Sequence, residues 1–174
     1  MKIGDKAKDF KLLGIDNNYY SLKDFDKEIL VIMFTCNHCP YVKAYEDRLI
    51  EIQEDYADKV QLVAINSNDD KAYSEDSFEN MQIRVREKSY NFPYLRDETQ
   101  KVAKAYSAER TPHIFVFDKD KILRYTGGVD DNYIDPSKVT KQYLRDALDA
   151  LINGQKIKNS VTHAIGCTIK WKGL

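Results

Sequence analysis

The hydrophobic positions along the chain fall either into short continuous runs or into stretches with helical spacing. One run from Glu28 to Phe34 is apolar after its first residue, and another spans Val60 to Asn66. Continuous runs of this length are typical of strands buried on both faces of a largely parallel sheet. Between them, apolar residues recur at spacings of three and four: Val42, Tyr45, Leu49, Ile52 and Tyr56. This spacing predicts an amphipathic helix, and therefore a strand–helix–strand unit.

The remaining pattern completes an α/β chain with a mixed sheet. It predicts a β-hairpin over 9–20, helices over 74–89 and 97–106, strands over 113–118 and 122–126, and a last helix from Val139 to Ile152. Residues 155–174 follow as a tail with no predicted element. Because no repeat or Pro/Gly/Ser-rich linker interrupts the 174 residues, we expect one domain, 1–174.

The charge balance excludes some classes of function. Lys and Arg number 27 against 28 Asp and Glu, so neither sign has the excess that a nucleic-acid or membrane-surface partner requires. The N-terminal residues lack the apolar core of a signal peptide, which predicts a cytoplasmic location. In a reducing compartment, two cysteines close in sequence are more often catalytic or metal-binding than a permanent disulfide.

Two of the three cysteines flank the start of the first predicted helix, in the stretch FTCNHCPYV. Cys36 follows the strand and Cys39 precedes Pro40, a residue that is tolerated in the first helical turn. A thiolate at a helix N-terminus is stabilised, which lowers a cysteine pKa from about 8.5 to roughly 3.5–7.5. We therefore expect Cys36 to be exposed, to have a lowered pKa and to attack, and Cys39 to lie one turn inside and resolve. A CxxC disulfide closes a small ring that opens easily, as a redox couple requires.

His38 and Cys167 each allow two interpretations. In one interpretation, protonated His38 stabilises the Cys36 thiolate. In the other, His38 is an exposed residue at the helix start without a role in the chemistry. Cys167 is by default a small buried hydrophobe, or an auxiliary thiol if the tail folds back over the site. Since ring closure over two residues needs no movement of the tail, we expect oxidation to give Cys36–Cys39 with Cys167 free.

Zinc binding is an alternative, because Cys36, Cys39, His163 and Cys167 are ligands of acceptable type. It is disfavoured because one cysteine pair opens a long amphipathic helix instead of lying in a turn. We expect no metal and no other cofactor.

Longer segments of the chain resemble one family. They are residues 4–10, the FTCNHCPYV stretch, NSNDDKAYSEDS (66–77), FPYLRDETQKVAKAY (92–106), TPHIFVFD (111–118) and IGCTIKWK (165–172). The chain thereby resembles the redoxins of the alkyl hydroperoxide reductase/thiol-specific antioxidant superfamily. Within this superfamily it resembles the bacterial proteins that carry the CNHCP motif. The resemblance implies a thioredoxin-like fold, a mixed central sheet flanked by helices, with an N-terminal hairpin and a C-terminal tail added.

The resemblance also implies a thiol–disulfide oxidoreductase in which Cys36 is the nucleophile and Cys39 resolves. The partners would be a protein disulfide, or a small disulfide or peroxide, and an electron donor. Pro112 would be a cis-proline facing the disulfide, and the backbone of Thr111 would then pair with an extended substrate strand.

Three departures from the pattern matter. Thr35 stands where thioredoxins have Trp, the strand before Cys36 contains no buried acid, and Arg110 and His113 flank Thr111-Pro112 in place of Cys and Asp. The missing acid leaves open whether His113 or His38 accepts the proton of Cys39. A thiol peroxidase is the runner-up: Arg110 is available as a cation, but Met33 stands where the required Thr would be.

Overall fold

The structure, a computed structural model, describes residues 1–173 and is organised around a mixed sheet. Its strand order is β2-β1-β5-β4-β3-β7-β8. The strands are β1 (Leu12–Gly14), β2 (Tyr19–Tyr20), β3 (Ile29–Thr35), β4 (Val60–Asn66), β5 (Tyr94–Arg96), β7 (His113–Phe117) and β8 (Leu123–Gly127). A separate two-stranded sheet pairs β6 (Arg110–Thr111) with β9 (Cys167–Thr168). β4 is parallel to β3 and β7 is antiparallel to it, so β3 has a neighbour on both sides.

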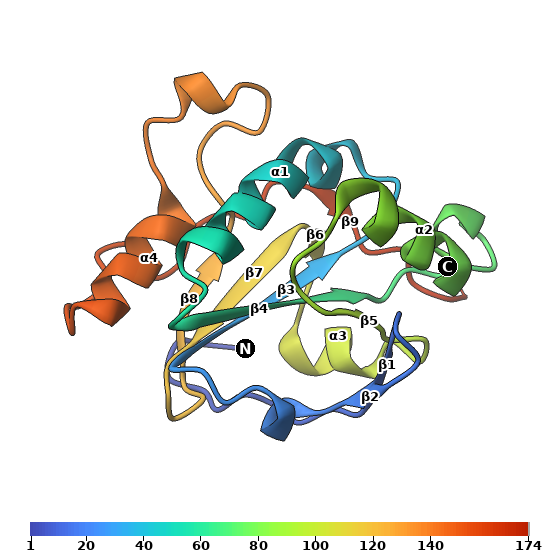
Figure 1. Cartoon of the computed structure of the whole chain (residues 1–174), viewed down its shortest axis with the longest axis horizontal. Coiled ribbons are helices and arrows are strands. Elements are labelled where there is room, and N and C mark those ends of the chain that lie inside the picture. Colours follow the sequence, from blue (N-terminus) through green and yellow to red (C-terminus); the bar gives the residue numbers. More distant parts are fainter. Residues whose placement is uncertain (174) are drawn as a thin grey trace.

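Helices cover both faces of the sheet (Figure 1). They are α1 (Pro40–Asp55), α2 (Phe78–Lys88), α3 (Lys101–Tyr106) and α4 (Tyr143–Ile152), with short 3₁₀ turns η1 (Leu22–Asp24), η2 (Ser74–Asp76) and η3 (Pro136–Lys138). α1, α2 and α4 lie on one face and α3 on the other, and the two core clusters divide in the same way. No helix among residues 1–173 is long and apolar enough to cross a membrane.

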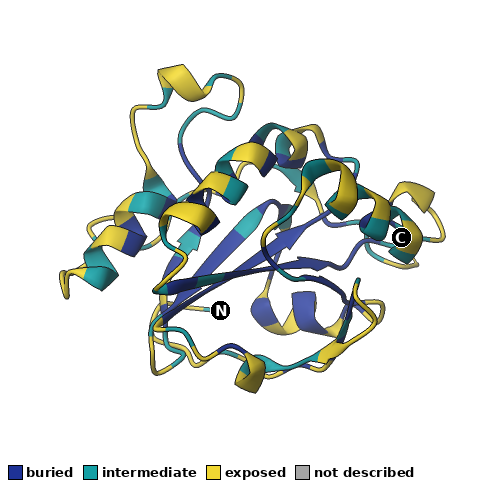
Figure 2. Cartoon of the chain, viewed as in Figure 1, coloured by how far each residue is buried: buried dark blue, intermediate teal, exposed yellow. Residues whose placement is uncertain are grey.

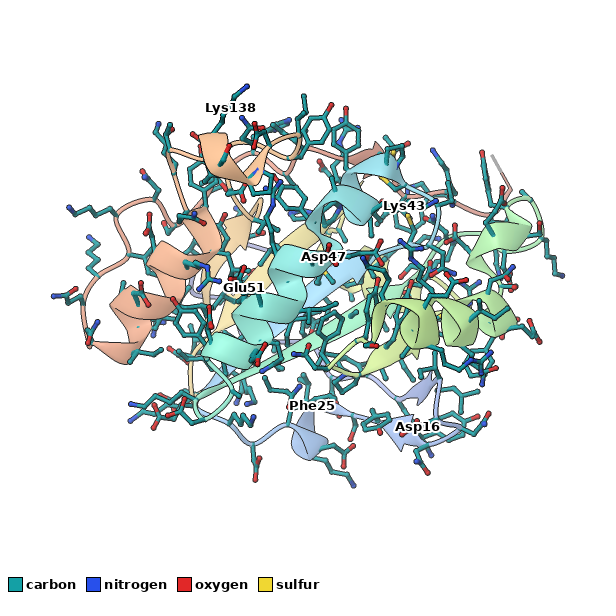
Figure 3. All side chains as sticks on the ribbon, turned by 45° about the horizontal axis from the view of Figure 1, so that its top comes forward. Asp16, Phe25, Lys43, Asp47, Glu51 and Lys138 are labelled. Atoms are coloured by element: carbon teal, nitrogen blue, oxygen red, sulfur yellow. The ribbon has the colours of Figure 1, made fainter. Side chains whose placement is uncertain are left out.

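Every residue of β3 is buried, which explains its continuous apolar sequence (Figure 2). Alternate side chains of a strand point to opposite faces. Val31 therefore packs with Leu49 of α1 in one cluster, and Ile32 packs with Tyr106 of α3 in the other. On the outer side of α1, Lys43, Asp47 and Glu51 are exposed at intervals of four residues (Figure 3).

The predicted strand–helix–strand unit, the N-terminal hairpin and the mixed sheet are confirmed. Three predicted helices are shorter than expected. The helix over 74–89 is divided, because the side chain of Ser77 accepts a hydrogen bond from Asn80 N and begins α2 there. The helix over 97–106 begins only at Lys101, and the last helix begins at Tyr143. Three short strands were not predicted: β5, β6 and β9, the last of them within the supposedly irregular tail.

Candidate active site

The pairing of β3 with β7 brings Thr111 to Cys36. Phe34 is the register partner of His113, and continuing this antiparallel pairing by two residues sets Cys36 opposite Thr111. Thr111 Oγ1 lies 3.4 Å from Cys36 Sγ. The Thr111–Pro112 peptide bond is cis, which confirms that expectation.

Three thiols meet beside this peptide bond. The tail runs back over the site, where Thr111 of β6 is the register partner of Cys167 of β9. Cys39 Sγ lies 2.8 Å from Cys167 Sγ and 3.4 Å from the Thr111 carbonyl oxygen. All three cysteines are free. Cys36 and Cys39 share one buried cluster, and Cys167 packs against it.

The negative charge of this cluster is best placed on Cys39. The Cys36 thiol lowers the pKa of Cys39 well below its usual range, and the side chain and backbone of Cys167 add to this against the effect of burial. The interaction with Cys39 raises the pKa of Cys36, and burial and the Asp76 carboxylate raise it further. Cys39 occupies the N-cap position of α1 without a capping hydrogen bond from its side chain, and the helix dipole favours an anion at this end.

Two expectations for Cys36 are therefore wrong. Its side chain is not exposed, because Cys36 is 1% and Cys39 0% accessible, whereas Cys167 is half-buried. Its pKa is raised, not lowered. The reasons are the interaction with Cys39, burial and the Asp76 carboxylate, and the N-cap position of the helix belongs to Cys39 and not to the first cysteine.

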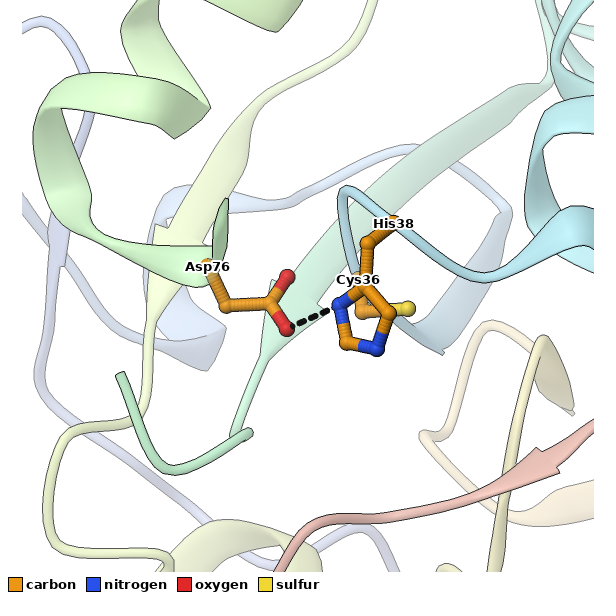
Figure 4. Close-up of side chains that lie close together, drawn as sticks. All are labelled: Cys36, His38 and Asp76. Atoms are coloured by element: carbon orange, nitrogen blue, oxygen red, sulfur yellow. Dashed lines mark ion pairs between the residues drawn. The ribbon is translucent and has the colours of Figure 1, made fainter. Parts of the chain in front are cut away.

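Asp76 is a buried acid at the site that sequence reasoning missed. It is 0% accessible and accepts hydrogen bonds from Asn37 N at 2.7 Å, Asn68 Nδ2 at 2.9 Å and Asn66 Nδ2 at 3.1 Å. His38 Nδ1 lies 2.7 Å from its Oδ2 as an ion-pair contact (Figure 4). The sequence offered one signal, the polar residues that follow β4, because the carboxyl ends of adjacent parallel strands meet at the same edge of a sheet.

His38 and Asp76 also lie next to the first cysteine. Donor atoms of Cys36, His38 and Asp76 all lie within 4.8 Å of one another. The His38 ring stacks on Tyr73, with centroids 5.6 Å apart, and its side chain is 25% accessible. His38 thus lies beside Cys36 and is partly open to solvent.

We predict that Asp76→Asn lowers the pKa of Cys36, because the variant removes a negative charge that opposes the thiolate. In a Cys39→Ser/Cys167→Ser background, where Cys36 is the single thiol, the midpoint of alkylation rate against pH should fall by about one unit. Asp97→Asn is the matched control, since Asp97 is equally buried but is bonded to Ser67 and Ala103. An equal shift in both variants, or none in Asp76→Asn, would contradict the assignment.

Of two further residues singled out in the sequence, His113 lies away from the thiol cluster and Arg110 acts on one of its cysteines. His113 is half-buried, and its ring nitrogens contact Glu109 N at 3.3 Å and Thr126 Oγ1 at 3.2 Å. Burial lowers the pKa of His113 to about 4. Because both ring nitrogens are engaged in these contacts, His113 is not placed to accept the proton of Cys39. The Arg110 charge acts on Cys167, whose pKa it lowers against the larger effect of burial.

The proposed zinc ligands do not form one group. His163 lines a cavity with His113 and Thr126, apart from the thiols. Among residues 1–173, the grouping of possible metal ligands is instead Cys36, His38 and Asp76. Both carboxylate oxygens of Asp76 are already engaged by backbone and side-chain donors.

Comparison with known structures supports the architecture. The chain is similar to an uncharacterized conserved protein from Geobacillus kaustophilus, with 44% identity and a TM-score of 0.94 over 99% of this chain and 94% of that chain. It is also similar to peroxidoxin BcpB from Mycobacterium tuberculosis, with 19% identity and a TM-score of 0.66 over 88% of this chain and 97% of that one. A putative thiol:disulfide interchange protein DsbE from Chlorobium tepidum gives 19% identity and a TM-score of 0.67 over the same shares. A comparison with curated proteins gives no match.

The sheet order, the cis-proline and the cysteines before α1 define a protein of the thioredoxin-like fold, in which the distant neighbours also share. The model of the AhpC/TSA family matches residues 3–126. The chain belongs to the AhpC/TSA family. Cys36, Cys39, Thr111 and Pro112 lie within the matched part, and Cys167 lies beyond it.

Proposed function

We propose that the protein is a thiol–disulfide oxidoreductase that uses Cys36 and Cys39 as its redox couple. The observation that carries the proposal is the position of Cys39, a buried sulfur that packs in one cluster with Cys36 and whose pKa is lowered. Attack on a disulfide requires a thiolate. The lowered pKa favours the thiolate of Cys39, which packs close to a mixed disulfide held on Cys36.

The reduction of a disulfide R–S–S–R′ then proceeds in two displacements. Cys36 attacks one sulfur as its proton passes to the Cys39 thiolate, which hands that proton to the leaving R′ sulfur. The products are a Cys36–S–S–R mixed disulfide, R′–SH and the Cys39 thiolate. Cys39 next attacks Cys36 Sγ, expels R–S⁻ and leaves a Cys36–Cys39 disulfide. An external dithiol returns the two electrons.

Thr111 and the His38–Asp76 pair would assist this chemistry. The Thr111 hydroxyl lies 3.4 Å from Cys36 Sγ and can donate to that sulfur as charge develops on it. The carboxylate of Asp76 holds Nδ1 of His38 at 2.7 Å, which orients the ring. The pair takes the place of the buried acid that the preceding strand lacks.

A thiol peroxidase is the second candidate, since the family name covers peroxide reduction and a peroxidoxin shares the fold. It is disfavoured by the surroundings of Cys36. Met33, where a peroxidase would have Thr, is packed in the core, and the charge of Arg110 acts on Cys167.

The assay that tests the proposal compares two oxidants under one reductant. Reduced protein receives either a small aromatic disulfide or hydrogen peroxide, with a dithiol as electron donor, and turnover is followed for each. We expect turnover of the disulfide and little above background with peroxide. Cys36→Ser should abolish disulfide turnover, and a metal analysis of the purified protein accompanies the assay. Faster peroxide consumption that depends on Cys36 would favour the peroxidase.

A further inference from the structure

The tail that carries Cys167 is held at the site on both of its sides. After Cys167, Ile169 is buried and its N–H donates to the Glu109 carbonyl at 3.1 Å, and Lys170 N donates to Asn68 Oδ1 at 2.9 Å. Before it, Thr162 N donates to the Thr126 carbonyl at 3.0 Å. The segment is therefore a docked strand, and the Cys167 sulfur is held against Cys39.

Gly166 is what permits this close approach. A Cβ at residue 166 would lie 2.2 Å from the Thr111 carbonyl oxygen and 2.7 Å from its carbon, which are backbone atoms that cannot turn aside. Any larger residue must lift the strand from β6. The chain thus has glycine at the point where the tail passes over the Thr111–Pro112 bond.

The tail also occupies the edge that was expected to receive substrate. The sequence predicted that the backbone of Thr111 would pair with an extended substrate strand, whereas the structure pairs it with Cys167 of the same chain. Cys167 therefore stands where a substrate cysteine would be brought to the redox couple.

We propose that Cys167 is a third redox cysteine. It attacks Cys39 in the Cys36–Cys39 disulfide, and the stable disulfide of the oxidised protein is then Cys39–Cys167. The step is an exchange: the Cys39–Cys167 bond forms, the Cys36–Cys39 bond breaks, and the proton of Cys167 passes to Cys36. No electrons enter or leave. This inference rests on the proposed function, because the substrate disulfide is the oxidant that forms the Cys36–Cys39 disulfide.

The exchange moves one sulfur of the disulfide to a more accessible residue. Cys36 and Cys39 are 1% and 0% accessible in the reduced protein. Cys167 is only half-buried, and a disulfide that ends there presents one sulfur to the donor. When the donor attacks Cys167, Cys39 leaves as the thiolate, and a sulfur of low pKa leaves fastest.

The experiment is to map the disulfide by peptide mass spectrometry. Reduced full-length protein is oxidised with one equivalent of diamide, quenched in acid, blocked with N-ethylmaleimide and digested without reductant. We expect the Cys39–Cys167 peptide pair as the main product, with the label on Cys36. The same pair should form in Cys36→Ser, and Cys167→Ser should show only Cys36–Cys39. Wild-type protein with Cys36–Cys39 as the main product and the label on Cys167 would overturn the inference.

Gly166→Ala tests the docking of the tail while all three thiols remain. It should shift the main product from Cys39–Cys167 to Cys36–Cys39. Gly154→Ala is the control: Gly154 has a φ of +65°, so alanine strains the backbone there, but its Cβ meets no atom within 4 Å. It therefore replaces a glycine at a cost in stability without a clash, and it should keep the wild-type product. An unchanged product in Gly166→Ala would contradict the role of the docked strand, and Cys167→Ser remains informative if Gly166→Ala fails to fold.

The proposed function and the exchange at Cys167 can fail separately. If wild-type protein turns over disulfides but oxidises only to Cys36–Cys39, the relay through Cys167 is wrong and the proposed function stands. If diamide produces Cys39–Cys167 but the protein reduces no disulfide, the proposed function is wrong. The exchange then takes place in the protein, but no disulfide substrate starts it.

Discussion

Cys39→Ser is expected to lower disulfide turnover at least about a hundredfold and to leave the substrate covalently bound to Cys36. A serine hydroxyl does not attack a disulfide, so the first displacement is not followed by a second. A steady-state assay measures the loss of turnover. Intact-protein mass spectrometry detects the added mass of the bound substrate.

Two other variants give this experiment its controls. Cys36→Ser should lose turnover to a similar extent without trapping substrate, because the sulfur that receives the mixed disulfide is gone. Cys167→Ser should still form Cys36–Cys39 in a single turnover, since both cysteines of the couple remain. Normal turnover by Cys39→Ser, or an adduct on a residue other than Cys36, would show that the roles are assigned wrongly.

The central part of the fold could be predicted from local sequence. β3 and β4 are apolar throughout because both of their faces are covered, and α1 shows helical spacing because only one of its faces is buried. The short strands β5 and β9 have no such pattern. Each has two or three residues, and each exists only because a partner far along the chain offers its edge.

The site divides in the same way. The CxxC pair, His38 and Thr111-Pro112 are visible in the sequence because each is a short motif at an element boundary. Asp76 is not, because its proximity to Cys36 depends on how the segment after β4 folds back.

The electrostatics of the pair could not be read from the motif at all. The neighbours that set the pKa of Cys39 include Cys167, which is 128 residues away in the sequence. A helix N-terminus favours an anion, but which of two cysteines benefits depends on where the helix begins. Here it begins at Pro40, which makes Cys39 the capping residue.

The position of the thiolate gives the last prediction, a pH dependence of stability in the reduced protein. The folded-state pKa of Cys39 is lowered, whereas in the unfolded chain it returns to about 8.5. A group with a depressed folded pKa contributes its full stabilisation above the unfolded pKa and loses it as the pH falls toward the folded one. The difference in unfolding free energy between wild type and Cys39→Ser should therefore grow as the pH rises from about 5 to about 8.

Urea unfolding under reducing conditions at a series of pH values measures this difference, and groups that titrate equally in both proteins cancel. The raised pKa of Cys36 acts only above about 8.5, where deprotonation of the unfolded chain opposes folding, so it leaves the chosen window unaffected. Thiolate absorbance at neutral pH should in parallel be present in the reduced wild type and absent from Cys39→Ser. A free-energy difference that stays flat between pH 5 and 8, together with unchanged thiolate absorbance in the variant, would place the charge on another cysteine and remove the basis for treating Cys39 as the resolving sulfur.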